Sequence, residues 1–431
     1  MSTQAIQSPL HNRSFRALVA AQFLGAYNDN LFKMLVSLMA VDAADTAIGS
    51  GGYLSLTGIV FIVPYLLFSG YAGHVSDRFA KRRVLVASKA AEVAIMGLAI
   101  VALVAGDVDA MLVVLFLLAA QSTFFSPAKF GVLPEMLPMG QLAQANGTLE
   151  MARYVAVILG SVSAGALLVA FPDRPFLLGA ILLAVAVVGS LVSLRIRPPA
   201  APRTRTAFSI NPFGSIGQGL RRIAADKPLR NAVIGITYFE SLAAFVMMDV
   251  LLLGQDVLGL DELGSGMLLA VAGIGIGIGA AIAGRLSAGR INLAITLPAS
   301  AGVAAMLLTL SLCEHGFVDT AVLIGLVGVF GGMFMVPLNA QLQHRAGDAE
   351  KGATISANNV LNMSGALFAC GLLWLTHDVL GIAADGVILV AGVIATAAAL
   401  AQIHFSGGLG VAFGNLPRML RRPAAVEAAA E

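Results

Sequence analysis

Charged residues are scarce in this chain of 431 residues. They make up 12% of it, against about 25% in an ordinary soluble domain. Hydrophobic residues make up 58%, and the mean hydropathy is +0.87. A soluble fold of this length cannot hide so much apolar surface from water. The composition therefore excludes a soluble protein and predicts an integral membrane protein.

Cysteine is also rare. Cys313 and Cys370 lie far apart, each within an apolar run, so they suggest no disulfide framework and no metal site. We expect two small buried side chains and neither a metal nor a cofactor. The N-terminal segment, residues 1–16, lacks an apolar run that ends in a small-residue cleavage site, so we expect no cleaved signal peptide.

Long apolar runs dominate the rest of the chain. A membrane-spanning helix needs about 20 mostly apolar residues, and each backbone polar group must be paired within it. Alternating segments of a β-barrel are absent. The sequence predicts an all-α membrane protein with twelve spans, near residues 15–41, 52–73, 84–105, 110–133, 142–171, 175–194, 230–254, 263–284, 292–312, 318–341, 352–377 and 384–405.

The distribution of Lys and Arg predicts how these spans are oriented. With the N-terminus in the cytoplasm, the inside segments contain 21 Lys or Arg residues and the outside loops contain only Arg174. Because cytoplasmic loops carry the excess of positive charge, we expect both termini in the cytoplasm.

The longest loop divides the spans six and six. We expect an N-terminal six-helix bundle (1–195), a cytoplasmic linker (196–228), a C-terminal six-helix bundle (229–406) and a cytoplasmic tail (407–431). Within the linker, four apolar residues recur at helical spacing beside Arg221 and Arg222: Phe213, Ile216, Leu220 and Ile223. They predict a short amphipathic helix on the anionic leaflet; the alternative is a solvated linker.

The two halves resemble each other in sequence. FFSPAKFGVLPEM after the fourth span corresponds to MFMVPLNAQLQ after the tenth, and QANGTLE corresponds to SANNVLN. Repeated halves with a site between them are typical of secondary transporters. The glycine-rich AGIGIGIGAAIAG lies within a span and lacks the residues of a phosphate-binding loop. Its glycines, spaced by four, predict close helix packing.

GHVSDRFAKRR, after the second span, resembles the loop signature of the major facilitator superfamily. Five residues fit the pattern, and Ala80 replaces its second glycine: Gly73, Asp77, Arg78, Lys81 and Arg82. Gly73 would let two helices approach, and Asp77 would cap a neighbouring helix N-terminus. The cations would pair with acids on adjacent spans. The resemblance implies a gate that holds one face shut; the alternative is a plain basic loop.

Several stretches together resemble the bacterial lysophospholipid transporter family, over roughly residues 14–405: QFLGAYNDNLFK, SPAKFGVL, QANGTLE, GSVSAG and VPLNAQLQ. The resemblance implies movement of lysophospholipids, chiefly lysophosphatidylethanolamine, from the outer to the inner leaflet, where an acyltransferase restores the missing chain. Some relatives carry that enzyme fused to the transporter. Its His-x-x-x-x-Asp signature is absent here, so we expect a separate acyltransferase partner.

Ionisable residues at membrane depth are the candidate site. A charge at the centre of a span costs at least about 2.5–3.5 kcal/mol, so Asp29 should face a wet cavity or a cation. It would engage a substrate ammonium, or form a structural ion pair with Lys33 or Lys129. The neighbouring amide Asn30 would bind a glycerophosphate head group or join helices. A further pair, Lys89 and Glu92, is expected to be mainly structural.

Lys129, near the end of the fourth span, would hold a lipid phosphate as a point charge; the alternative is snorkelling to the interface. Glu150 and Arg153 lie three residues apart on one helix face. They are expected to form an internal pair, with Arg153 free for phosphate as the alternative. The second half would contribute Glu240 and polar amides: Asn339, Asn358 and Asn359.

Together these features predict a transporter that alternates access around a central site. No nucleotide-binding motif is present, so transport either is driven by a gradient or needs no energy source. The runner-up function is a proton-coupled exporter of drugs or other amphiphiles, with Asp29 or Glu240 carrying the proton. A third hypothesis is a membrane scaffold for the acyltransferase. No set of residues indicates an enzyme or a nucleic-acid partner.

Overall fold

The computed structural model describes residues 8–42, 49–197, 212–287, 291–312, 316–347 and 350–405. The predicted tail, 407–431, and residues 198–211 of the linker lie outside them. The long helices of the first half are α1 (Arg13–Asp42), α2 (Gly49–Arg78), α3 (Lys81–Ala105), α4 (Val108–Met136), α5 (Leu142–Ala170) and α6 (Pro175–Ser193). Those of the second half are α8 (Lys227–Leu252), α9 (Glu262–Leu286), α10 (Thr296–Leu312), α11 (Phe317–Arg345), α12 (Lys351–Leu373) and α13 (Ala384–Phe405).

Each predicted span corresponds to one of these helices, so the expected all-α membrane fold is confirmed. Among the described residues, 11 helical segments are long and apolar enough to cross a membrane. The twelfth helix, α1, is 30 residues long. It is not among these 11 segments, because the polar residues Asn28–Asn30 and Lys33 lower its mean hydropathy. It packs against α5 and α6 within the first half. Its length and its packing within the first half are those of a spanning helix, as the sequence predicts.

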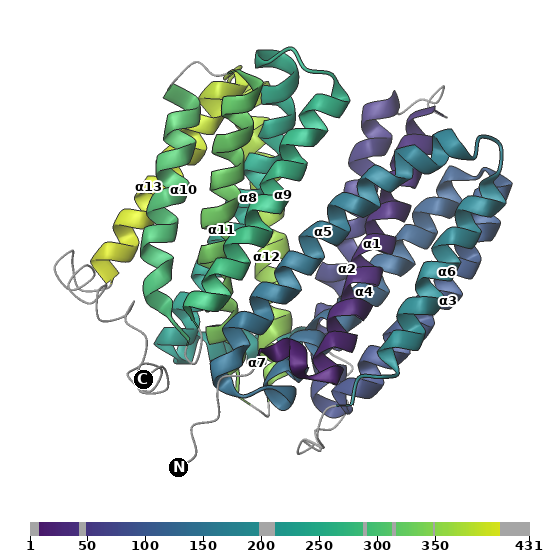
Figure 1. Ribbon diagram of the computed structural model, residues 1–431, viewed down its shortest axis with the longest axis horizontal. Helices are drawn as coiled ribbons and strands as arrows, with labels where there is room; N and C mark the ends of the chain where they lie inside the picture. Colours follow the sequence, from purple (N-terminus) through teal and green to yellow (C-terminus); the bar gives the residue numbers. More distant parts are fainter. Residues whose placement is uncertain are drawn as a thin grey trace, which may run out of the picture.

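The helices form two groups, α1–α6 and α8–α13, which diverge away from the end where α7 lies (Figure 1). The groups meet mainly along two seams, one between α2 and α12 and one between α5 and α9. Glycines allow both close approaches: a Cβ on Gly73 would meet the Gly352 carbonyl, and a Cβ on Gly147 would meet the Ala280 carbonyl. The prediction that the glycine-rich stretch of α9 packs against helices is confirmed.

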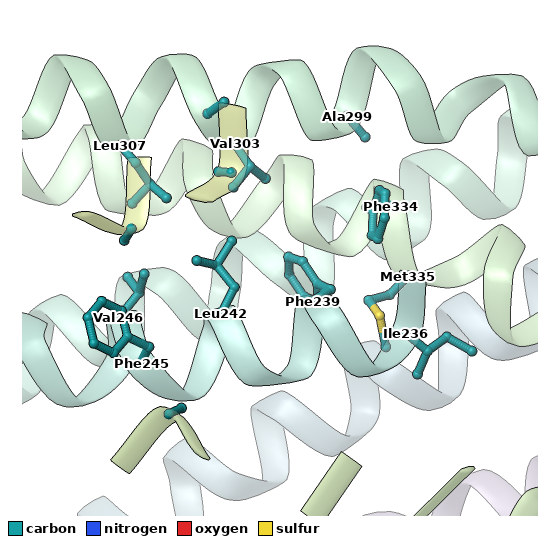
Figure 2. Close-up of a cluster of buried hydrophobic side chains, with 14 of the residues drawn as sticks. Ile236, Phe239, Leu242, Phe245, Val246, Ala299, Val303, Leu307, Phe334 and Met335 are labelled. Carbon is teal, nitrogen blue, oxygen red and sulfur yellow. The ribbon is translucent and has the colours of Figure 1, made fainter. Parts of the chain in front are cut away.

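The second half has its own apolar core (Figure 2). Side chains of α8 recur every three or four residues along one face and pack against α10 and α11. The rings of Phe239 and Phe334, for example, are 5.7 Å apart. Because this stripe is buried in the core, the polar residues Thr237, Glu240 and Ser241 lie on another face of α8.

A short helix, α7 (Pro212–Ala225), lies at the end where the halves meet (Figure 1). It packs on α2 of the first half and on α12 of the second, and a Cβ on Gly219 would meet the Ala353 carbonyl. The sequence predicts that the apolar residues of α7 share one membrane-facing surface, and this prediction is wrong. Ile223 is buried in the second-half core, whereas Phe213 is 75% exposed. Part of the α7 face that was predicted to lie on the membrane is therefore buried against the second half instead.

Candidate functional site

Asp29 lies midway along α1 and is half-buried. Its Oδ2 accepts a hydrogen bond of 2.7 Å from the Ser122 hydroxyl of α4, and its Oδ1 is buried without a hydrogen-bond partner. The predicted alternative, an ion pair with Lys33 or Lys129, is wrong: no cation among the described residues lies within 4.0 Å of it. The Lys33 ammonium lies 5.1 Å from the ring centre of Phe61 instead.

The other charges beside Asp29 neutralise each other. Lys89 Nζ and Glu92 Oε2 of α3 are 2.5 Å apart and buried, and Asn28 Nδ2 donates to Glu92 Oε1 at 3.4 Å. Gly25 of α1 leaves room for this ammonium, because a Cβ there would collide with Lys89 Nζ. The expected structural role of Lys89 and Glu92 is confirmed, and Asp29 beside them has no cationic partner among the described residues.

Lys129 of α4 is only 8% exposed, so the alternative that it snorkels to the interface is wrong. Its ammonium lies 4.2 Å from the ring centre of Phe130, a cation–π contact. No carboxylate among the described residues lies within 4.0 Å of it, although Glu150 and Arg153 are in electrostatic range. Lys129 is therefore a buried cation whose charge no direct partner neutralises.

Arg153 and Glu150 of α5 form the predicted pair, with Nε donating to Oε2 at 2.9 Å. The guanidinium also lies 4.2 Å from the ring centre of Tyr154. Only its Nε–H binds the carboxylate, and the side chain remains 32% exposed. The pair therefore positions the guanidinium, while an accessible part of it remains for a further anion.

Residues of other helices surround this pair. Glu240 of α8 is in electrostatic range of Arg153 and Glu150, so the second half contributes a carboxylate to a group otherwise built by the first. Tyr65 of α2 is in range of both Asp29 and Arg153. The sequence reasoning missed Tyr65 and Tyr154, although Tyr154 directly follows Arg153 and Tyr65 follows the in-helix Pro64. The site thus combines Asp29, which has no cation within 4.0 Å among the described residues, with the cations Lys129 and Arg153 and the carboxylates of Glu150 and Glu240.

The predicted amides do not form one cluster. Asn30 donates to the Ala26 carbonyl of its own helix at 2.8 Å, and Asn359 of α12 donates to Ser126 of α4 at 3.0 Å. Asn339 and Asn358 are both buried, and Asn358 Oδ1 has no hydrogen-bond partner. Substrate binding by these four residues stays a prediction, and Asn359 currently joins the two halves.

A second amide contact between the halves joins Asn146 and Gln343, neither of which the sequence reasoning proposed as a site residue. Asn146 of α5 and Gln343 of α11 donate to each other at 3.0 and 2.6 Å, and both are buried. The only sequence signal for it is the pair of matching polar stretches in the two halves. Both contacts, Asn359–Ser126 and Asn146–Gln343, join the two halves. They therefore favour the arrangement in which the halves lie close together at the α7 end.

The predicted gate residues lie at the same end. Asp77 of α2 accepts hydrogen bonds from the Gly352 and Ala353 amides at 2.6 and 3.0 Å, so it caps the N-terminus of α12 as expected. Gly73, one turn earlier, allows this approach. A carboxylate at a helix N-terminus is stabilised by unpaired N–H groups and the helix dipole. The contact links the two halves directly.

The cations of the same loop bind within the first half. Lys81 pairs with Glu135 of α4 at 2.5 Å, as the sequence predicts. Arg82 instead donates to the Leu194 and Ile196 carbonyls beyond the end of α6, and the Arg78 guanidinium lies 5.8 Å from the Phe79 ring centre. These contacts stabilise the position of the turn that carries Asp77. Its function as a gate stays a prediction.

This fold matches that of a large class of membrane transporters. The family model of the Major Facilitator Superfamily matches residues 18–370, and the chain belongs to that family. It is also similar to the lysophospholipid transporter LplT of Shigella dysenteriae serotype 1 (strain Sd197). The two are 29% identical over 370 residues, which cover 84% of this chain and 88% of the relative. The LplT of Escherichia coli O1:K1 / APEC is equally similar. Both resemblances seen in the sequence are confirmed.

Solved structures show the same fold. The transporter FucP in the outward conformation has a TM-score of 0.70 at 15% identity, over 90% of this chain and 98% of that one. The human organic anion transporter MFSD10 (TETRAN) has a TM-score of 0.68 at 16% identity, over 91% and 99%. At these identities the likeness supports the twelve-helix architecture alone.

Proposed function

We propose that this protein is a secondary transporter that moves lysophospholipids, chiefly lysophosphatidylethanolamine, between the leaflets of the bacterial inner membrane. The similarity to LplT over most of both chains supports the substrate class. We further propose that both termini are cytoplasmic, because the excess of Lys and Arg lies on their side. The end at which α7 lies then faces the cytoplasm, and movement runs from the outer to the inner leaflet.

The observation that carries the substrate proposal is the separation of charge in the first half. Lys129 is a buried cation without a direct carboxylate partner, and Arg153 has an accessible part. Asp29 keeps one carboxylate oxygen without a hydrogen-bond donor. A zwitterionic head group carries one phosphate and one ammonium. The two cations would bind its phosphate, and Asp29 would bind its ammonium.

Alternating access would follow from the contacts between the halves. The Asp77 cap and the two amide contacts would hold the α7 end closed, so the site would open toward the other end. Entry of a head group beside Arg153 would change the electrostatic balance with Glu240 on the opposite half. We propose that this balance couples binding to the movement of the halves. The lipid product would then pass to a separate acyltransferase.

Reconstitution tests the proposal directly. Purified protein in liposomes should transfer labelled lysophosphatidylethanolamine between leaflets, and an ionophore that collapses the proton gradient should leave the rate unchanged. Inhibition by the ionophore would favour the runner-up, a proton-coupled exporter, for which the unpaired Asp29 is the supporting observation. Inactive liposomes that still bind an acyltransferase would favour the scaffold hypothesis.

Charge reversal provides the matched test of the site. Asp29→Lys and Lys129→Glu should abolish transfer, because each places the wrong charge beside the head group. Asn362→Ala is the control: Asn362 accepts a hydrogen bond from Thr237 at 3.0 Å within the second half, so its loss should have a mild effect. Equal losses in all three variants would contradict a head-group site in the first half.

A further inference from the structure

A groove opens between α2 and α3 of the first half, and its lining contains none of the residues proposed to bind substrate. The two helices make few contacts with each other, whereas each packs on α4. The groove has a volume of about 370 Å³ and is mostly apolar. It is lined by Val75, Phe79, Arg83, Val84, Ala87, Ser88, Ala91, Gln121 and Phe124. Its position between diverging helices opens it toward the surrounding membrane.

One cation lies at the mouth of this groove. Arg83, in the first turn of α3, is exposed, and no carboxylate among the described residues lies within 4.0 Å of it. Its neighbours in the loop are engaged: Lys81 pairs with Glu135, and Arg82 binds backbone carbonyls of the first half. Arg83 is therefore the cation of this turn that remains for an external anion.

Two buried polar side chains line the groove farther in. Ser88 and Gln121 are each only 7% exposed. The Ser88 hydroxyl makes no hydrogen bond to the described residues. The Gln121 amide lies 3.2 Å from the Ser122 hydroxyl, which already donates its one hydrogen to Asp29, so Gln121 belongs to that polar network. The Ser88 hydroxyl is not among the fully buried polar atoms without a partner, so it is accessible in the groove and can donate to a ligand that offers an oxygen atom.

The spacing of these groups fits a glycerophospholipid. Ser88 follows Arg83 by five residues on α3, which places it about 7.5 Å deeper along the helix axis. A glycerophospholipid has a phosphate at the membrane surface, ester carbonyls below it and an acyl chain below those. The groove volume equals roughly twelve times the share of one water molecule in the liquid, which suits one acyl chain.

We propose that this groove binds a diacyl glycerophospholipid of the leaflet on the α7 side. The phosphate binds Arg83, an ester carbonyl accepts from Ser88, and one acyl chain lies along Val84, Ala87 and the other apolar residues of the lining. Charge complementarity at the mouth and the unpartnered Ser88 hydroxyl favour this occupant over a plain hydrocarbon. The phosphate-binding end of the groove, at Arg83, contains none of the residues proposed to bind the transported substrate.

Native mass spectrometry of the purified full-length chain tests this proposal. Dioleoylphosphatidylglycerol should bind at one saturable site, whereas dioleoylglycerol, which lacks the phosphate, and inorganic phosphate should not. Arg83→Gln should weaken lipid binding at least about tenfold, as expected for the loss of a charge-assisted contact. The matched control is Arg195→Gln, which removes an exposed cation outside the groove and should leave binding unchanged.

Filling the groove gives an independent arm. Ala91→Phe should abolish the saturable site, while Ala90→Phe, at an exposed position outside the lining, should retain it. If Ala91→Phe does not fold, Ala87→Phe serves the same purpose. Equal binding by Arg83→Gln and its control would overturn the proposal. So would binding of dioleoylglycerol as strong as that of the phospholipid, or binding of a lysophospholipid alone.

Discussion

Replacing Asp77 by Asn should open the end of the protein that is closed in this structure. The Asp77 carboxylate accepts two backbone hydrogen bonds from α12, at 2.6 and 3.0 Å. Asn has the same shape but no charge, and its single oxygen cannot serve both amides as well. Hydrogen bonds to a charged group contribute about 1.5–3 kcal/mol each, and neutral ones about 0.5–1.5. We therefore expect Asp77→Asn to destabilise the closed arrangement by about 2 kcal/mol.

A change of this size is readily measured as a shift in populations. About 2 kcal/mol corresponds to roughly a thirtyfold change in an equilibrium constant. Pairs of spin labels at the α7 ends of α2 and α12 should show a longer-distance population in Asp77→Asn that is minor in the unmodified protein. Labels at the opposite ends of the same helices should move closer, because the halves rock as units.

Asp226→Asn is the matched control for this experiment. Asp226 also caps a helix, accepting from the Leu229 amide of α8 at 3.0 Å, and it pairs with Arg345 of α11 at 3.3 Å. Both partners belong to the second half, so this substitution should leave the distances between halves unchanged. The reasoning is refuted if Asp77→Asn gives the same distance distribution as the control, or if it increases the closed population.

Four further outcomes are expected. Gly219→Val should lower the thermal stability and the closed population, measured by melting and by the same spin labels, because its side chain would collide with α12. Asp249→Asn should maintain or raise the melting temperature, since both carboxylate oxygens of Asp249 are buried without partners and an unpaired buried charge is costly; a strong loss would contradict this. The Leu229 amide and Arg345 hold the pKa of Asp226 below its usual range, so its contribution to stability is present at neutral pH. This contribution should be lost as the pH falls through that lowered pKa. In Asp226→Asn the melting temperature should therefore depend less on pH in the acid range. Arg153→Lys should reduce lysophospholipid transfer, measured in liposomes, more than it reduces stability, because Lys retains the charge but not the guanidinium geometry.

Much of the architecture could be predicted from the sequence, for physical reasons that particular residues illustrate. Each span needs a long apolar run, so each helix could be predicted from its own segment of the sequence. The contact of Asp77 with a helix N-terminus could also be predicted, because its loop resembles the signature of the major facilitator superfamily and Gly73 lets a neighbouring helix approach. Glu150 and Arg153 could be paired because helix geometry brings residues three apart together.

The parts that failed depend on contacts between distant segments. The sequence did not exclude an ion pair between Asp29 and Lys33, one turn apart on α1, because the position of the Lys33 ammonium beside the Phe61 ring depends on how α2 packs. The partners of Asn146 and Asn359 lie in the other half of the chain. Tyr65 enters the site only because α2 faces α1. Such arrangements follow from tertiary packing, which a local pattern does not encode.

The two seams between the halves differ in chemistry. Both seams contain glycines that bring backbone against backbone. Among the described residues, the seam of α2 and α12 is also fixed by directional hydrogen bonds to Asp77, whereas α5 and α9 make no side-chain hydrogen bond to each other. Contacts without such a bond tolerate sliding, because no single bond must break before the surfaces shift. The α5–α9 seam is thus suited to act as a bearing on which the bundles turn, while the other acts as a catch that defines where the turn stops.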